Sequence, residues 1–373
     1  MTAGLRELSK RAVWVVVFDN MCVDVADAIV RPSAANASHG DKLRAATFFR
    51  RCLSNHVQAD AVWSAPFGSL TDFEALLRGT AEYNSLLVTT GKPETSLDET
   101  GLLFSQRLQL NLPPGNEQMQ LHSGLRECLK NAEIVWWNVA CPSSARSRET
   151  TTELQSQDEA THSDNDGNGD TSDCLTSSTR FAANVIAAIQ DLRRQLEPSG
   201  RQTTLILTAG QGGSRQVSAP FTTRIAADRI HVPLIVETDQ PHPCFSQQLC
   251  CTRDVLPTIR DLLNRSTASA LVPADSGAVI NPSTQSMSLL AYLAAPSEPI
   301  DRRLFLRTDT ESVVCTSAFL AILPDDESSA DQERRLSLYV QPDDYWCIHD
   351  VSSVEPEETA RMTDLLAAYC ESR

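Results

Sequence analysis

The chain contains no run of about 20 consecutive apolar residues, the length that a membrane-spanning helix needs. We therefore expect no membrane partner. Near the N-terminus, charged residues lead directly into a short apolar run over residues 13–18. That run is too short for the apolar part of a secretion signal followed by a cleavage site. The sequence therefore predicts a cytoplasmic protein whose first strand lies close to the N-terminus.

Positive charge is scarce in the sequence. Lys and Arg number 32 against 48 Asp and Glu, which gives a formal net charge of −16. Because such a surface repels phosphate backbones, we expect no nucleic-acid partner. Aromatic residues make up only 6% of the chain and hydrophobic residues 41%, a composition typical of a globular protein with a moderately apolar core.

Several common signatures of enzyme sites are also missing. The chain has no G-x-S-x-G motif, no Walker A loop and no H-x-x-x-H pair. The 11 cysteines show no zinc-binding spacing, so we expect reduced thiols that pack in the interior, including the neighbours Cys250 and Cys251. A dinucleotide fingerprint at Gly210 and Gly212 would need a third glycine where Arg215 stands.

Apolar runs and amphipathic stretches alternate through most of the chain, which is typical of an α/β domain with a mostly parallel sheet. The runs predict strands over residues 13–18, 57–63, 85–90, 108–112, 134–139, 203–208 and 232–236. The amphipathic stretches predict helices over residues 41–56, 70–78, 181–196 and 252–263.

The alternation fades near residue 281, and the C-terminal part resembles a small α+β unit. Short strands are predicted over residues 304–307, 318–322 and 336–340, with a last helix over 355–370. We therefore divide the chain into an α/β domain, residues 1–285, and a C-terminal subdomain, residues 286–373.

Residues 149–175 differ in composition from the rest. Eight acidic residues and no Lys or Arg fall within residues 149–173, which predicts a flexible surface insertion. Residues 164–170 resemble the first half of a calcium loop. However, Leu175 occupies the position where that loop requires a glutamate, so a solvated acidic loop is the simpler interpretation.

The stretch 205–213 is the most informative one for function. An apolar run ends there in a glycine-rich turn, which predicts a buried strand that delivers a loop to the carboxyl edge of the sheet. Other polar residues take similar positions, because Asp19 and Asn20 end the first strand and Ser69 precedes a helix. Each also has a purely structural interpretation, as a strand end or as a helix cap.

Two later motifs carry a family resemblance. Residues 231–235 read His-Val-Pro-Leu-Ile, and residues 254–258 read Asp-Val-Leu-Pro-Thr. Together with the C-terminal segment 338–351 and the acidic helix after it, they resemble the sulfatase family of the alkaline phosphatase superfamily. The resemblance covers nearly the whole chain apart from the acidic insertion. It implies that family's fold, a central and mostly parallel sheet between helices, with a small C-terminal α+β subdomain.

The resemblance also implies a set of site residues. Asp19 matches the first of the family's paired metal-binding aspartates, and Asn20 stands at the second position. Gln211 lies in the metal-binding turn, where Gly210 replaces an aspartate. Ser69 takes the nucleophile position.

The nucleophile position depends on the distance to Gly79, which resembles the end of the family's nucleophile motif. Residues 64–66 match the local motif better but lie at the wrong distance from that glycine. The substrate-binding lysine and histidine of the family would fall near Arg224 and His231.

A calcium site uses about six to eight oxygen ligands, several of them carboxylates, and Asp19 is the one matching aspartate left. We therefore expect a sulfatase-like pseudoenzyme that acts in binding or regulation, with no cofactor and with a sulfated or phosphorylated ligand. One alternative is an active sulfuric or phosphoric ester hydrolase that uses Ser69 with Ca²⁺ or Mg²⁺. Another, outside the family, is an α/β protein that binds a phosphorylated ligand at its glycine-rich turn.

Overall fold

The structure is a computed structural model. It describes residues 11–30, 46–54, 67, 69–77, 84–90, 103–110, 123–140, 169–196, 202–212, 230–237, 244–264, 286–294, 300–307, 311–324 and 335–371. The predicted strand 57–63, Arg224 and residues 149–168 lie outside these ranges.

The larger part of the molecule is built on an eight-stranded sheet of order β4-β3-β5-β1-β6-β7-β2-β8. Its strands are β1 (Arg11–Asn20), β2 (Ala46–Leu53), β3 (Ser85–Thr90), β4 (Gln106–Leu110), β5 (Ile134–Val139), β6 (Gln202–Gln211), β7 (His231–Glu237) and β8 (Cys244–Cys251). Within this described sheet, β7 alone runs antiparallel to its neighbours. The predicted fold class is confirmed.

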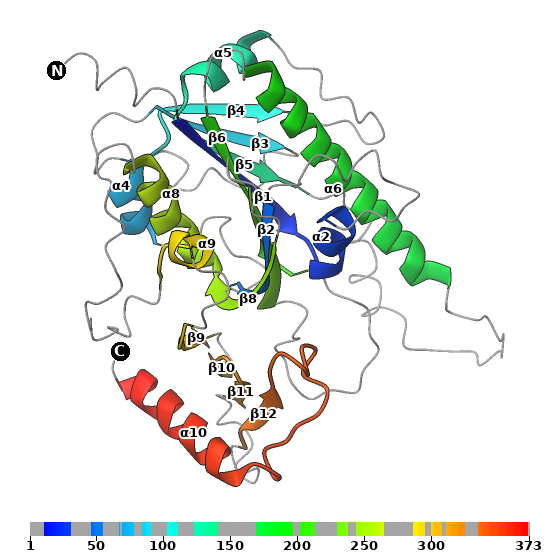
Figure 1. Cartoon of the computed structure of the whole chain (residues 1–373), viewed down its shortest axis with the longest axis vertical. Helices are drawn as coiled ribbons and strands as arrows, with labels where there is room; N and C mark the ends of the chain where they lie inside the picture. The colour runs from blue at the N-terminus through cyan, green and yellow to red at the C-terminus, as the bar shows by residue number, and fades with distance from the viewer. Residues whose placement is uncertain are drawn as a thin grey trace, which may run out of the picture.

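Helices cover both faces of the large sheet (Figure 1). The helices α2 (Val23–Val30) and α6 (Gly169–Leu196) pack together on one face. On the other face lie α4 (Leu70–Leu77) and α8 (Val255–Asn264). Because both faces are covered, the central strands are largely apolar, and every residue of β5 is buried. The helix α5 (Ser123–Asn131) lies near β4 at one end.

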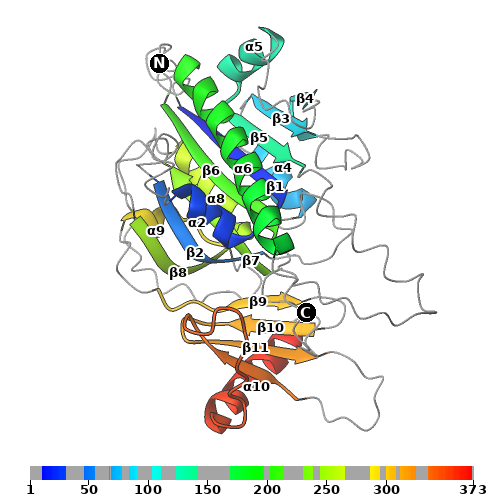
Figure 2. The same cartoon turned by 90° about the vertical axis from the view of Figure 1, so that its right-hand side faces the viewer.

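The C-terminal part contains a four-stranded antiparallel sheet of order β12-β11-β10-β9 and a long helix. Its elements are β9 (Leu304–Arg307), β10 (Glu311–Cys315), β11 (Phe319–Pro324), β12 (Ser337–Val340) and α10 (Pro356–Glu371). Met362 and Leu366 of α10 pack against this sheet. The small sheet lies beyond the carboxyl edge of the large one (Figure 2).

The segment between the sheets packs with the large one. It contains α9 (Leu290–Ala294), and Leu289, Leu290 and Tyr292 belong to the core of the large sheet. The domain boundary at residue 285 stays a prediction. None of the described helices is long and apolar enough to cross a membrane.

Some elements differ from the sequence predictions. The predicted helix 41–56 is wrong over its described part, where β2 lies between β7 and β8. Almost every residue of β2 is buried, because its side chains pack on both faces of the sheet. Its apolar residues therefore do not form the single stripe of an amphipathic helix. β8 and β10 were not predicted. α6 begins at Gly169, inside the predicted insertion, and not near residue 181.

Candidate functional site

The carboxyl edge of the large sheet brings several predicted site residues onto neighbouring strand ends. Asn20, the last residue of β1, pairs with Gln211 at the end of β6. β7 runs in the opposite direction and therefore begins at this edge with His231. The paired part of β6 and β7 ends at Thr208 and Leu234, so Gln211 and His231 each lie three residues beyond it toward this edge. Strand ends of this kind are where α/β proteins bind ligands.

Asp19 is half-buried at the same edge, one residue before the end of β1. The side chain of Asn20 lies outside the described part of the structure. Gln211 is likewise half-buried, and its carbonyl accepts a hydrogen bond from the Met21 amide at 3.3 Å. The edge thus presents one carboxylate and one amide on adjacent strands.

Ser54, the residue after β2, is hydrogen-bonded to Gly210 at the start of the glycine-rich turn. Its hydroxyl donates to the carbonyl of Gly210 at 2.5 Å, and its amide donates to the carbonyl of Ile230 at 2.7 Å. Ser54 is fully buried, so these bonds fix the backbone at the start of the turn. Sequence reasoning missed Ser54 because the preceding strand had been predicted as a helix.

Ser69 begins α4 as a helix cap. Its hydroxyl accepts from the Asp72 amide at 3.2 Å and donates to the Asp72 carboxylate at 2.8 Å. The same carboxylate accepts from the Ser69 amide at 2.7 Å, which completes a reciprocal capping arrangement. The structural interpretation of Ser69 as a cap is confirmed, and its hydroxyl lies beside a carboxylate.

His231 is covered by an aromatic residue from the C-terminal subdomain. The rings of His231 and Tyr345 stack with centroids 4.0 Å apart and an interplanar angle of 23°. Burial raises the pKa of Tyr345, so its phenol stays protonated at neutral pH. The Tyr345 hydroxyl is buried and has no hydrogen-bond partner within the described structure. The turn after β12 therefore places an aromatic ring against His231 at the start of β7.

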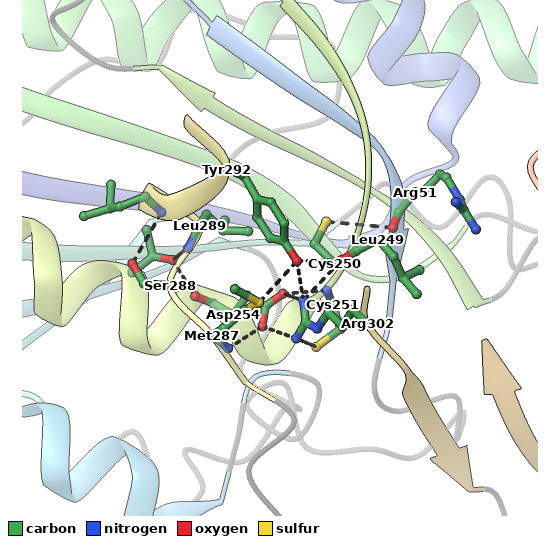
Figure 3. Close-up of polar contacts among 12 residues, drawn as sticks. Arg51, Leu249, Cys250, Cys251, Asp254, Met287, Ser288, Leu289, Tyr292 and Arg302 are labelled. Atoms are coloured by element: carbon green, nitrogen blue, oxygen red, sulfur yellow. Dashed lines mark hydrogen bonds and ion pairs between the residues drawn. The ribbon is translucent and has the colours of Figure 1, made fainter. Parts of the chain in front are cut away.

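A buried ion pair joins the large sheet to the segment that leads into the small one (Figure 3). Arg302 donates to the two carboxylate oxygens of Asp254 at 2.6 and 2.7 Å. Asp254 also accepts from the amides of Cys251 at 2.8 Å and Met287 at 2.9 Å. Burial alone would lower the pKa of Arg302, but the Asp254 carboxylate outweighs that effect and raises it, so the guanidinium stays charged. Asp254 is therefore a structural residue, as predicted.

A second buried polar contact, besides the Asp254–Arg302 ion pair, connects β2 to the small sheet. The buried guanidinium of Arg51 donates to the carbonyls of Thr316 and Ser317, each at 2.9 Å. Apolar residues of both sheets share one cluster around this point, including Leu53 and Leu304. These contacts hold the turn between β10 and β11 against β2.

The donors at the carboxyl edge do not match the preference of a calcium ion. Among the residues that the structure describes, no group of three or more His, Cys, Asp and Glu could hold a metal. Gly210 offers only a carbonyl, and that carbonyl already accepts from Ser54. Calcium prefers about six to eight oxygens, several of them carboxylates. We therefore derive no chemistry from a metal at this edge.

No protein-family model and no curated protein sequence matches the chain. Similar solved structures include Ps i-CgsB in complex with k-i-k-neocarrahexaose, with a TM-score of 0.61 and 15% identity over 96% of this chain and 92% of that one. A putative sulfatase from Bacteroides thetaiotaomicron gives a TM-score of 0.59 and 13% identity, over 97% of this chain and 92% of that one. A third structure is in complex with its substrate D-glucosamine-2-N,6-O-disulfate. It has a TM-score of 0.56 and 12% identity, over 97% of this chain and 98% of that one.

These matches extend over both sheets, because each covers nearly all of this chain and of the other protein. At such low identities the likeness establishes a fold and leaves the activity open. The chain has the fold of these sulfatase structures.

Proposed function

We propose that this sulfatase-like protein binds a sulfated or phosphorylated ligand at the carboxyl edge of its large sheet and is impaired in hydrolysing the ester bond. The observation that carries the proposal is the position of Gln211 and His231 at the ends of neighbouring strands, with Tyr345 stacked on His231. The half-buried amide of Gln211 supplies hydrogen-bond donors suited to anionic oxygens, whereas His231 and the Tyr345 hydroxyl are buried. One protein of the same fold is bound to a disulfated sugar, which supports this class of ligand.

The surroundings of Ser69 support the proposal of impaired catalysis. A serine hydroxyl needs an adjacent base or a cation to become a nucleophile. Here the hydroxyl and amide of Ser69 both donate to the Asp72 carboxylate, an acceptor suited to a helix cap. A negative charge beside Ser69 also repels a sulfate or phosphate ester. Cleavage of these esters requires positive charge near the developing anionic oxygens, which Asp72 does not provide.

A hydrolysis assay tests the catalytic half of the proposal. We expect purified protein to release nitrophenol from 4-nitrophenyl sulfate or 4-nitrophenyl phosphate only slowly, with or without added Ca²⁺ or Mg²⁺. Ser69→Ala should leave that residual rate unchanged. A metal-dependent turnover that Ser69→Ala abolishes would instead establish the active hydrolase.

A further inference from the structure

One fully buried serine is hydrogen-bonded both to the end of β6 and to the residue before β7. The pairing of β6 with β7 ends at Thr208 and Leu234, before the carboxyl edge is reached. Ser54 follows β2 directly, and its hydroxyl donates to the carbonyl of Gly210 on β6 at 2.5 Å. Ser54 therefore supplies a donor to β6 beyond the last β6–β7 pair.

The position of Ser54 is set by the strand that precedes it. Leu53 pairs with His231 of β7 on one side and with Cys251 of β8 on the other. The Ser54 amide extends the contact with β7, because it donates to the carbonyl of Ile230 at 2.7 Å. Since the preceding residue is paired on both sides and the side chain is buried, the hydroxyl is held in place.

The glycine-rich turn depends on restraints of this kind. Gln211 is flanked by Gly210 and Gly212, and glycine has more backbone freedom than any other residue. The carbonyl of Gln211 accepts from the Met21 amide at 3.3 Å, which is long for an amide donor. The bond from Ser54 to the neighbouring Gly210 carbonyl lies within the usual range for a hydroxyl donor. It is therefore the stronger of these two restraints.

We propose that Ser54 is a positioning residue of the candidate site, because its hydroxyl fixes the backbone that carries Gln211 before a ligand binds. The inference rests on the proposed function, in which the Gln211 amide contacts a sulfated or phosphorylated ligand. A binding group that is already ordered in the free protein loses less conformational entropy on binding. Ligand affinity therefore depends on Ser54, although Ser54 is buried and acts through Gln211.

Calorimetric titration of the full chain with D-glucosamine-2-N,6-O-disulfate tests this role. Ser54→Ala should bind the sugar about three- to tenfold more weakly than the natural protein, the effect of one hydrogen bond. The double variant Ser54→Ala/Gln211→Ala should bind no more weakly than Gln211→Ala, because Ser54 acts through Gln211. Unchanged affinity in Ser54→Ala, or losses that multiply in the double variant, would overturn the proposal.

Thr258→Val is the matched control. The Thr258 hydroxyl is also fully buried and also donates to a backbone carbonyl, that of Asp254 at 2.6 Å. Its removal should lower stability but leave the affinity for the sugar unchanged. Equal losses of affinity in Thr258→Val and Ser54→Ala would assign the effect to general destabilisation and contradict the proposal. Ser54→Cys keeps a similar size with a weak donor, so it carries the same test if Ser54→Ala does not fold.

Hydrogen–deuterium exchange of the ligand-free protein separates this inference from the proposed function. Exchange should be faster in Ser54→Ala within the peptides that contain Met21 and Gln211, and Thr258→Val should leave those peptides unchanged. If the natural protein does not bind the sugar, the proposed function fails, while faster exchange in Ser54→Ala still supports the restraint on the turn. Unchanged exchange in Ser54→Ala would overturn the positioning role, whether or not the sugar binds.

Discussion

Asp254 and Arg302 form a buried ion pair whose side chains are 0% and 6% exposed. The pair is fully hydrogen-bonded, since Asp254 accepts from two backbone amides as well as from Arg302. A buried charge that loses its partner is strongly destabilising, although a well-packed apolar pair in its place often is not. This asymmetry gives the first testable prediction.

We expect Asp254→Leu to lower the free energy of unfolding by about 3–5 kcal/mol, because it leaves the Arg302 guanidinium buried without a counter-charge. Urea-induced unfolding measures the loss. The double variant Asp254→Leu/Arg302→Leu should recover part of it. If the loss in the double variant equals the sum of the losses in Asp254→Leu and Arg302→Leu, the two residues do not act as a coupled pair.

Asp350 gives a pH-dependent prediction. Burial alone would raise its pKa, but hydrogen bonds from the amides of Leu338 and Ser352 outweigh burial and lower the pKa from 3.8. A carboxyl whose pKa is depressed on folding stabilises the protein above its unfolded pKa, and that stabilisation is lost as the pH falls through the folded pKa. We therefore expect stability to fall below about pH 4.

The matched variant for this effect is Asp350→Asn, which keeps an oxygen acceptor for both amides but does not titrate in this range. Unfolding free energies of the two proteins should converge as the pH falls from about 5 to about 3. Parallel pH curves for the two proteins would show that Asp350 does not contribute to the acid sensitivity.

The sequence indicated the structural role of Asp254 but not its partner. A carboxylate three residues after Cys251, in the first turn of the predicted helix 252–263, is a local capping signal, and the Cys251 amide does donate to it. Arg302 lies 48 residues further along the chain, and no local pattern points to it. Tyr345 was missed for the same reason, since its stacking partner is His231.

At the scale of single elements, the beginning of α4 depends on Ser69. We expect Ser69→Ala to destabilise the protein by about 1 kcal/mol, because the Asp72 amide loses its acceptor. Ser69→Thr keeps a capping hydroxyl and should stay within a few tenths of a kcal/mol of the natural protein. Thermal unfolding of the two variants measures the difference. Equal melting temperatures for both variants would contradict the capping role.

Elements with a strong local pattern were predicted correctly, whereas buried strands were harder to predict from the sequence. The apolar stripe of α10 contains Met362, Leu366 and Tyr369, and all three are buried as the helical spacing indicates. β2 contains buried Arg51, whose charge broke the apolar run and favoured a helical interpretation. The carbonyls that satisfy Arg51 belong to Thr316 and Ser317 in the other sheet, so only tertiary structure explains a cation inside this strand.

At the scale of the whole molecule, both the large sheet and the C-terminal part contribute residues to the candidate site. The large sheet supplies strand ends with Asp19, Gln211 and His231, and the turn after β12 supplies Tyr345. The strand ends were predictable, because parallel strands place their last residues at one edge. The contribution of the small sheet was not, because it depends on how Arg51 and Arg302 join the two parts.

The most direct test of the central claim, binding of an oxyanion ester with impaired hydrolysis, is calorimetric titration of D-glucosamine-2-N,6-O-disulfate followed by measurement of free sulfate in the same sample. We predict saturable binding to the natural protein, about tenfold weaker binding to Gln211→Ala through loss of one hydrogen bond to a charged group, and almost no released sulfate. Absence of binding, or rapid release of sulfate that Ser69→Ala abolishes, would contradict the account.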